Sequence, residues 1–272
     1  MSIESFSLKD KVIIVTGGTG ILGEAFIRGI VEAGGVVGIL GRNQKVAQER
    51  ADAVKAKGGK AIALIADVLN EEDVLAARKQ VLDEFGRIDG LVNGAGGNMP
   101  GGILQPEDNI FKMSIAGMRQ VMDLNLWGTL IPTQIFGEVM AEKQHGSIVN
   151  ISSMASQRAI TKVLGYSMAK SAIDCYTQWF AVEVANRYKD KIRMNAIAPG
   201  FFLTEQNRTL LTQPDGGYTE RGNLVIKNTP FKRFGDPDEL IGALIWLLSD
   251  ASKFVTGTVI NVDGGFSVFS GV

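Results

Sequence analysis

The sequence is poor in the residues that bind metals and form disulfides. Its 272 residues include one cysteine and one histidine. No disulfide can therefore form within the chain, and no cysteine or histidine cluster can hold a metal ion. We expect no metal site. The cysteine, Cys175, is expected to be a small buried apolar residue rather than a nucleophile.

Excess charge, long apolar runs and a targeting segment are lacking as well. The 28 basic and 29 acidic side chains nearly cancel, so electrostatics gives no reason to expect nucleic acid or a membrane as a partner. No apolar run reaches the roughly 18 residues of a membrane span. Residues 1–10 lack the basic-then-apolar layout of a signal peptide. We therefore expect a cytoplasmic protein.

Glycine and short apolar runs are abundant. The chain has 33 glycines and is 45% hydrophobic, which is typical of an α/β protein with many tight turns. We expect strands near 12–16, 36–40, 61–65, 88–92, 147–151, 192–197 and 258–262. We expect helices over 43–57, 115–143, 165–188 and 237–248, and one that follows the first strand and ends at Ala33. A further helix is expected after Asn70, which can act as its N-cap, with the carboxylate of Asp73 reaching back to the N-cap residue. This alternation predicts one α/β domain over 1–272, with about seven strands in a doubly wound parallel sheet and helices on both faces.

A glycine-rich loop directly follows the first expected strand. The spacing Gly18-x-Gly20-x-x-Gly23 lets the backbone turn sharply and approach a pyrophosphate closely. The N-terminus of the next helix then offers unpaired N–H groups to the phosphates. A glycine turn without a ligand is the alternative. We expect a dinucleotide site, and the loop residues assigned to it are Gly17, Thr19, Gly20, Ile21 and Leu22.

A tyrosine and a lysine lie four residues apart near the start of a long helix. This spacing places Tyr166 and Lys170 on one helix face. The ammonium would stabilise the phenolate, so we expect the pKa of the tyrosine to fall from about 10. Ser153, at the end of the fifth strand, could bond the same substrate oxygen. The pair alone is a weak signal, but beside a dinucleotide loop it predicts acid/base catalysis.

Two long segments interrupt the alternation of strands and helices. Residues 96–108 are rich in glycine, and 204–232 is a polar stretch rich in Thr, Asn and Gln. Each follows the carboxyl end of a strand, where open α/β sheets bind ligands. Segments of this length are often binding loops. We expect them to form the walls of a pocket for a small-molecule substrate, with solvated insertions as the alternative.

Together these motifs resemble the short-chain dehydrogenase/reductase family over about 8–265. The matching landmarks are the glycine loop, Asp67-Val68, Asn93-Gly94-Ala95-Gly96, Asn125, Ser153, Tyr166-x-x-x-Lys170, Asn195 and 199–204. The resemblance implies a Rossmann-type fold in which Tyr166 is the catalytic acid/base. Lys170 would lower its pKa and bind the nicotinamide ribose, and Ser153 would position the carbonyl. Asn125 would hold a water that links Lys170 to solvent.

The same resemblance implies the remaining cofactor contacts. Asp67 and Val68 would contact the adenine, and Asn93, Ala95 and Gly96 the ribose side. The carboxamide would meet Pro199, Gly200, Phe202 and Thr204. The sequence departs from the family pattern in two places: Gly20 comes one position early, which leaves the path of the loop open, and Gly94 replaces an asparagine.

The residues after the second strand bear on the choice of cofactor. An acidic residue there would bond the adenosine ribose and repel a 2′-phosphate. The sequence has Arg42 and Asn43 instead, and an arginine suits a phosphate. NADP(H) is therefore favoured, and NAD(H) stays open.

The variable segments resemble the D-mannonate oxidoreductase (fructuronate reductase) branch of the family. That likeness implies D-fructuronate and D-mannonate as the substrate pair. The side chains expected to meet substrate hydroxyls are Asn98, Gln157, Gln206 and Asn207. Those expected to pair with its carboxylate are Arg158, Lys162 and Arg208.

Other interpretations stay open. A 3-oxoacyl-carrier-protein reductase would need a basic surface on which its acidic carrier protein docks, and the near-neutral charge of the chain does not support one. A gluconate 5-dehydrogenase-like enzyme is a further alternative. A non-catalytic nucleotide-sensing protein would be expected to lack Tyr166 or Lys170, and both are present. The family also implies pairing of the long helices that carry Trp127 and Trp179, which gives a homodimer or homotetramer.

Overall fold

The computed structural model describes residues 3–271, apart from the side chains of Glu205 and Gln206. Within this range one parallel sheet of seven strands has the order β3-β2-β1-β4-β5-β6-β7. The strands are β1 Val12–Thr16, β2 Val36–Gly41, β3 Ala61–Ile65, β4 Gly90–Asn93, β5 Gly146–Ile151, β6 Ile192–Pro199 and β7 Val259–Val262. The expected doubly wound parallel sheet is confirmed.

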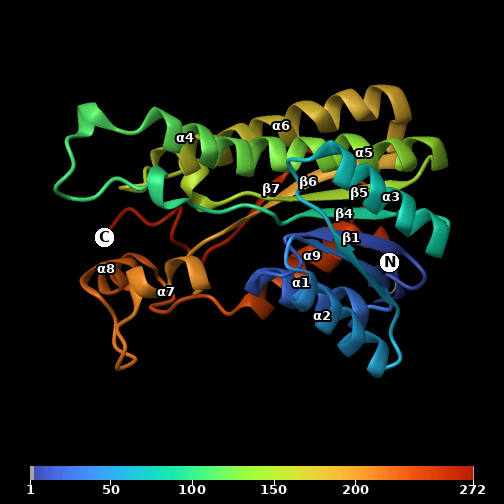
Figure 1. The fold of residues 1–272 in the computed structure, drawn as a ribbon, viewed down its shortest axis with the longest axis horizontal. Helices are drawn as coiled ribbons and strands as arrows, with labels where there is room; N and C mark the ends of the chain where they lie inside the picture. Colours follow the sequence, from blue (N-terminus) through green and yellow to red (C-terminus); the bar gives the residue numbers. More distant parts are fainter. Residues whose placement is uncertain (1–2, 272) are drawn as a thin grey trace.

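Helices cover both faces of the sheet (Figure 1). One face carries α1 Ile21–Glu32, α2 Gln44–Ala56 and α9 Ile241–Leu248. The other carries α3 Glu71–Phe85, α5 Gly128–Lys143 and α6 Leu164–Tyr188. Because both faces are covered, the strands have continuous apolar runs rather than alternating ones. In β1, Ile13 and Val15 enter the first core, and Val12 and Ile14 enter the second.

The helix expected over 115–143 is interrupted by one wide turn. It starts as α4 Ile115–Met122, passes through a π-helical turn at Asp123–Trp127 and continues as α5. The helix expected over 237–248 begins with a 3₁₀ turn at Pro237–Leu240. The wide turn carries Asn125, so the irregularity coincides with an expected site residue.

The start of α3 agrees with the sequence in part. Asn70 caps the helix through the N–H groups of Glu72 and Asp73. Asp73, however, does not reach back to its N-cap residue. Its carboxylate accepts from the N–H of Asp67 at 3.0 Å, so it fixes the turn that follows β3.

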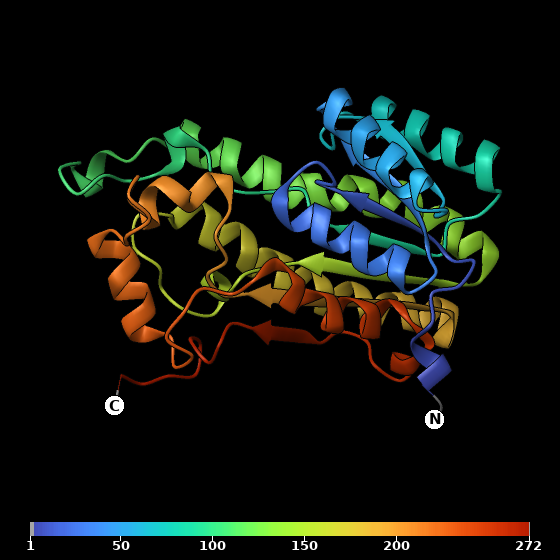
Figure 2. The same ribbon diagram turned by 90° about the horizontal axis from the view of Figure 1, so that it is seen from below.

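The polar segment 204–232 is largely helical rather than a loop. It contains α7 Glu205–Leu211 and α8 Glu220–Asn228, which pack on each other through Leu211 and Val225. Figures 1 and 2 both place α7 and α8 beyond the carboxyl ends of the strands, at the same end of the sheet as the segment that connects β4 to α4. The two segments that the sequence singles out therefore lie at one edge of the sheet.

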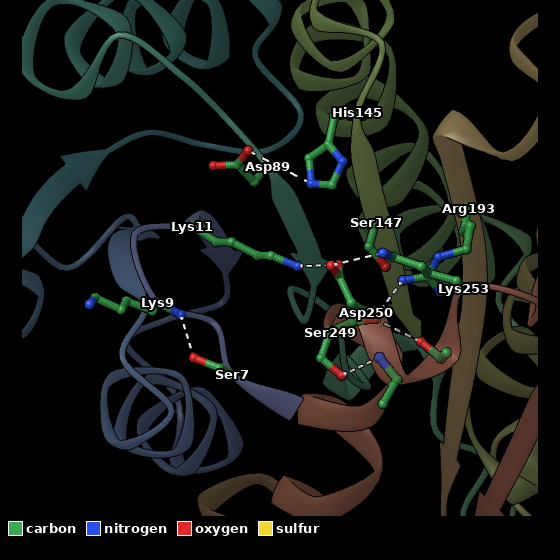
Figure 3. A network of polar contacts seen from close by, with 12 residues as sticks. Ser7, Lys9, Lys11, Asp89, His145, Ser147, Arg193, Ser249, Asp250 and Lys253 are labelled. Carbon is green, nitrogen blue, oxygen red and sulfur yellow. Dashed lines mark hydrogen bonds and ion pairs between the residues drawn. The ribbon is translucent and has the colours of Figure 1, made fainter. Parts of the chain in front are cut away.

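A polar network closes the opposite, amino end of the sheet (Figure 3). Arg193 is buried and donates to the carbonyls of Leu247 and Ser249 at 2.9 and 3.1 Å. Lys11 pairs with Asp250 at 2.7 Å. His145 also lies there, so the chain's histidine is at the end of the strands away from Tyr166.

Several apolar side chains on the long helices are exposed. Trp127 is 50% and Trp179 62% exposed, and Met168 and Val182 lie exposed on the same helix as Trp179. Cys175 is exposed on that helix too, so its expected burial is wrong for this chain. None of the helices described between residues 3 and 271 is long and apolar enough to span a membrane.

Candidate active site

The glycine loop lies where the sheet changes its winding direction. Strand β1 pairs with β2 on one side and with β4 on the other, and such a switch point is the usual ligand site of an open α/β sheet. Gly17 has φ +66°, and a Cβ there would lie 2.6 Å from the carbonyl oxygen of Gly94. A Cβ on Gly23 would lie 2.3 Å from the oxygen of Gly17. Only glycine fits this close packing.

The N-terminus of α1 is open toward the loop. Its N-cap residue is Gly20, so no side chain caps the N–H groups of the first turn. Uncapped N–H groups and the positive end of the helix dipole suit a pyrophosphate. The loop residues Gly17 and Thr19 precede this turn, and Ile21 and Leu22 begin it. The site therefore fits a dinucleotide.

Arg50, on α2, braces the loop from outside. One guanidinium nitrogen donates to the carbonyls of Gly18 and Gly20 at 2.5 and 2.8 Å. The other pairs with Glu24 at 2.9 Å. This arrangement fixes the path of the loop, which the early position of Gly20 left open. The sequence alone could not identify Arg50, because its partners lie 26 to 32 residues away.

Several residues expected to contact the adenosine end of the cofactor already have partners within the protein. Arg42 and Asp67 form an exposed ion pair at 3.7 Å. Asn43 caps α2 by accepting from the N–H of Val46 at 3.2 Å. Val68 is buried. Because an exposed pair of this length stabilises little, Arg42 can exchange Asp67 for a phosphate at small cost.

The loop after β4 is held by Thr16. Its hydroxyl accepts from the N–H groups of Gly94 and Ala95, both at 3.1 Å. The side chain of Asn93 lies in the interior and donates to Thr133 Oγ1 and Asn150 Oδ1, both at 2.8 Å. It therefore joins β4 to α5 and β5 instead of reaching toward a ribose.

A cavity of about 220 Å³ opens beside this loop at the carboxyl edge of the sheet. Many residues named from the sequence line it: Leu22, Gly96, Asn98, Ser153, Tyr166, Lys170, Pro199, Gly200, Phe202, Thr204 and Asn207. Apolar side chains of the two long segments complete the wall, among them Ile103, Leu210 and Leu211, together with Phe201 just before the second segment. The expected pocket between segments 96–108 and 204–232 therefore exists.

Ser153, Tyr166 and Lys170 meet in this cavity. The phenol of Tyr166 is hydrogen-bonded to the side chain of Ser153. The oxygen of Ser153 also accepts from the N–H of Ala155 at 3.1 Å. Lys170 Nζ lies 5.5 Å from the centre of the tyrosine ring and donates to the carbonyl of Ile151 at 2.7 Å. The three side chains thus surround one small volume.

The acid/base properties of this group differ from the expectation. Burial raises the pKa of Tyr166, and the bond to Ser153 only partly opposes this rise. Burial also lowers the pKa of Lys170 to about 8, against the attraction of Asp174. The expected fall of the tyrosine pKa is therefore wrong for this structure. At Tyr166 the cost of burying the charged form outweighs the bond to Ser153, and at Lys170 it outweighs the attraction of Asp174.

Asp174 supports the serine turn from α6 and was not identified from the sequence. Its carboxylate accepts from the hydroxyl of Ser152 and, at 2.5 Å, from that of Ser156. Burial raises the pKa of Asp174, which these bonds and Lys170 oppose. Asp174 follows Lys170 by four residues, and this spacing on one helix face is the signal in the sequence that could have identified it.

Asn125 fastens the loop that contains Gly97. Its amide accepts from the N–H of Gly97 at 2.9 Å and donates to the carbonyls of Gly97 and Val121, both at 2.7 Å. A Cβ on Gly96 would lie 2.6 Å from Asn125 Oδ1 and 3.4 Å from Lys170 Nζ. Asn125 therefore lies beside Lys170, and its side chain holds the backbone of this loop. The water expected between Asn125 and Lys170 stays a prediction.

The residues expected to bind substrate hydroxyls differ in whether they line the cavity and in what their side chains contact. Asn98 lines the cavity, and its Oδ1 is buried without a hydrogen-bond partner among the described atoms. Asn207 lines it too, but its amide bonds the N–H of Thr204 and the carbonyl of Phe202, both at 2.8 Å. Gln157 instead bonds Asn261 at 2.9 Å. The side chain of Gln206 lies outside the described part of the chain.

The cations expected to hold a carboxylate do not line this cavity. Arg158 Nε donates to the carbonyl of Ser267 at 2.5 Å and so anchors the C-terminal segment. Lys162 lines a separate cavity, and Arg208 is exposed. The cation that does line the cavity, besides Lys170, is Arg221 of α8. The sequence offered no local signal for it, because its position depends on how α8 packs over the sheet.

Comparison with known proteins agrees with this geometry. A family model described as enoyl-(acyl carrier protein) reductase matches residues 19–267. The uncharacterized oxidoreductase UxuB of Bacillus subtilis is 40% identical over 275 residues, covering 98% of each chain. A Haemophilus influenzae protein with bound NAD, provisionally assigned as a D-mannonate oxidoreductase, matches with a TM-score of 0.90 and 40% identity over 100% of both chains. A Burkholderia cenocepacia gluconate 5-dehydrogenase in complex with NADP and tartrate has a TM-score of 0.86 and 32% identity, covering 97% of this chain and 98% of its own.

Proposed function

The chain belongs to the short-chain dehydrogenase/reductase family of NAD(P)-dependent oxidoreductases, and from this premise we propose that its substrate is a sugar acid. The reaction is hydride transfer between the nicotinamide and a ketone or secondary alcohol. The substrate pair proposed is D-fructuronate and D-mannonate. The observation that carries the reaction is the meeting of Ser153, Tyr166 and Lys170 in one cavity beside the glycine loop.

Side chains of the protein transfer the proton that accompanies the hydride. In ketone reduction the phenol of Tyr166 donates its proton to the carbonyl oxygen, which the hydroxyl of Ser153 holds in place. Burial raises the pKa of Tyr166, so the phenol stays protonated at neutral pH, as a proton donor must. The charge of Lys170, which lies 5.5 Å from the ring centre, stabilises the phenolate as it forms. Asn125 keeps the Gly96–Gly97 backbone beside that ammonium.

The cofactor supplies or accepts the hydride when bound. Its pyrophosphate would be held by the loop from Gly17 to Leu22 and the open N-terminus of α1. Gly96 and Lys170 would meet the nicotinamide ribose, and the backbone of 199–204 its carboxamide. We favour NADP(H), because no carboxylate follows β2 and Arg42 is poorly held by Asp67.

The polar groups of the cavity support a substrate that carries hydroxyl groups. Asn98 Oδ1, buried without a partner among the described atoms, can accept from a substrate hydroxyl. Two solved relatives are described by sugar-acid activities, and one of them was solved with tartrate, a hydroxy acid.

The assembly proposed is a homodimer or homotetramer formed through the long helices. The exposed Trp127, Met168, Trp179 and Val182 are large apolar side chains on those helices. Large exposed apolar side chains are costly in water and suit a contact between copies of the chain.

A substrate panel tests the proposed activity. Purified protein is assayed with NADP(H) and NAD(H) against keto-hexonates, the matching uncharged ketoses and 3-oxoacyl thioesters. We expect turnover of one or more keto-hexonates, with kcat/KM at least about tenfold above that of the uncharged ketose. Turnover confined to acyl thioesters would refute the proposal and favour a 3-oxoacyl-carrier-protein reductase.

A further inference from the structure

The charges that line the catalytic cavity are all of one sign. Among the described residues of its wall, Lys170 and Arg221 are cationic, and no aspartate or glutamate is present. Lys170 is engaged with the carbonyl of Ile151 and lies beside Tyr166. Arg221 is therefore the cation left for a ligand. A partly enclosed site of this kind attracts anions.

The guanidinium of Arg221 is only loosely bound by the protein. It donates to Thr161 Oγ1 at 3.2 Å, the upper end of the usual range for N–H···O bonds, and to the carbonyl of Thr161 at 3.4 Å, which is beyond it. No carboxylate pairs with it among the side chains that the structure describes. A guanidinium has five N–H donors, so most of them are available to a ligand.

The position of Arg221 works against the stability of its own helix. It is the second residue of α8, directly after the N-cap Thr219 and Glu220. A cation in the first turn opposes the helix dipole. Its partial burial adds a cost as well, since desolvation lowers the pKa of Arg221 without a compensating carboxylate. An anion at this point would relieve both costs.

The backbone around Arg221 is held firmly. The N–H of Thr219 donates to the carbonyl of Leu211 at 3.1 Å, and the hydroxyl of Thr219 donates to that of Leu210 at 2.7 Å. A Cβ on Gly222 would lie 2.1 Å from the carbonyl oxygen of Leu211. The start of α8 is thus fixed against the end of α7, and the guanidinium is presented to the cavity from a rigid support.

From these contacts we infer that Arg221 binds the carboxylate of a small hydroxy acid through a bidentate ion pair. Asn98 Oδ1, in the same cavity wall, accepts from one of its hydroxyls. The inference rests on the proposed function for the identity of the acid, but not for the carboxylate itself. Under this inference, Arg221 is the residue by which the protein binds sugar acids more tightly than uncharged sugars of the same chain length.

Binding and turnover are measured separately to test this role. Calorimetry with the NADP-loaded protein compares D-gluconate with D-glucitol, which has the same chain length without the carboxylate. The variants are Arg221→Gln and Arg221→Lys, and the matched control is Lys227→Gln, an exposed residue of the same helix. Turnover of the best keto-hexonate and of its neutral ketose is measured in parallel, and circular dichroism verifies folding.

We expect the wild type and Lys227→Gln to bind D-gluconate alike, and Arg221→Gln to bind it at least about 30-fold more weakly. Arg221→Lys should recover part of the loss, because a lysine keeps the charge without the planar fork. D-glucitol should bind weakly and equally to all four proteins. In turnover, the loss in Arg221→Gln should lie mainly in KM, as expected for a group that binds substrate and transition state alike.

The results distinguish the two proposals. D-gluconate binding that is absent in the wild type, or equal in wild type and Arg221→Gln, would overturn the role of Arg221 even if hexonates are turned over. Binding that depends on Arg221 without any hexonate turnover would uphold the carboxylate site and refute the proposed sugar-acid reaction.

Discussion

Lys170 Nζ donates a 2.7 Å hydrogen bond to the carbonyl oxygen of Ile151. Ile151 is the last residue of β5, two residues before Ser153, so this bond ties the helix that carries the tyrosine to the strand that leads into the serine turn. The ammonium is buried at this position, and burial lowers the pKa of Lys170 to about 8. The burial of this ammonium in the catalytic cavity therefore makes the site sensitive to pH.

We predict that ketone reduction slows above pH 8. Below this pH Lys170 is charged and stabilises the phenolate that forms when Tyr166 gives up its proton. Above it the charge is lost, so kcat/KM should fall by about tenfold per pH unit. A pH profile of kcat/KM checks this. A Lys170→Arg variant that keeps measurable activity should lose the alkaline limb, and a wild-type profile flat to pH 10 would contradict the assignment.

Asp174→Asn should shift this limb to lower pH. The change keeps the size of the side chain but removes the negative charge that raises the pKa of Lys170. It also weakens the bonds that hold Ser152 and Ser156. We expect a shift of about one pH unit and a lower kcat. Asp83→Asn, on the exposed surface of α3, is the control. An unshifted limb would show that Asp174 is only structural.

Much of the site was predictable because it depends on local pattern. The glycine loop, the strand ends and the spacing of Tyr166 and Lys170 are written in consecutive residues, and the structure places them as expected. Two of the wrong expectations concern burial. The pKa of Tyr166 and the exposure of Cys175 depend on which neighbours cover them, and pattern does not reveal those neighbours.

The contacts that the sequence missed are long-range. Arg50 bonds residues 26 to 32 positions away, and Arg221 bonds Thr161, which is 60 positions away. Arg158 looked equally suitable for a carboxylate, yet it bonds Ser267. Choosing among such cations requires the packing of α8 and of the C-terminal segment.

Arg42→Ala should change the choice of cofactor. Arg42 is exposed and its pair with Asp67 is long, so its guanidinium can pair with the 2′-phosphate of NADP(H). We expect kcat/KM for NADPH to fall by about tenfold or more, with little change for NADH. Lys45→Ala, a neighbouring exposed cation, is the control. A wild-type preference for NADH that Arg42→Ala does not alter would refute NADP(H) as the cofactor.

Cys175 reports on the proposed assembly. It is exposed on α6, the helix that also carries the exposed Trp179. If copies of the chain pair through this face, the native thiol should react slowly with a thiol reagent. Trp179→Glu should give monomers by light scattering and speed the labelling by at least about tenfold. Leu75→Glu, on the exposed side of α3, should change neither. A monomeric wild type with a fast-reacting thiol would exclude the assembly.

The central claim is that the phenol of Tyr166 transfers the proton in a hydride-transfer reaction. Tyr166→Phe removes one oxygen and leaves the cavity wall in place, so its kinetics test that claim most directly. We predict that kcat for ketone reduction falls by about 10²–10⁴-fold, while NADP(H) binds within about twofold of the wild-type affinity. A variant that keeps full activity, or one that loses nucleotide binding and activity together, would contradict the account.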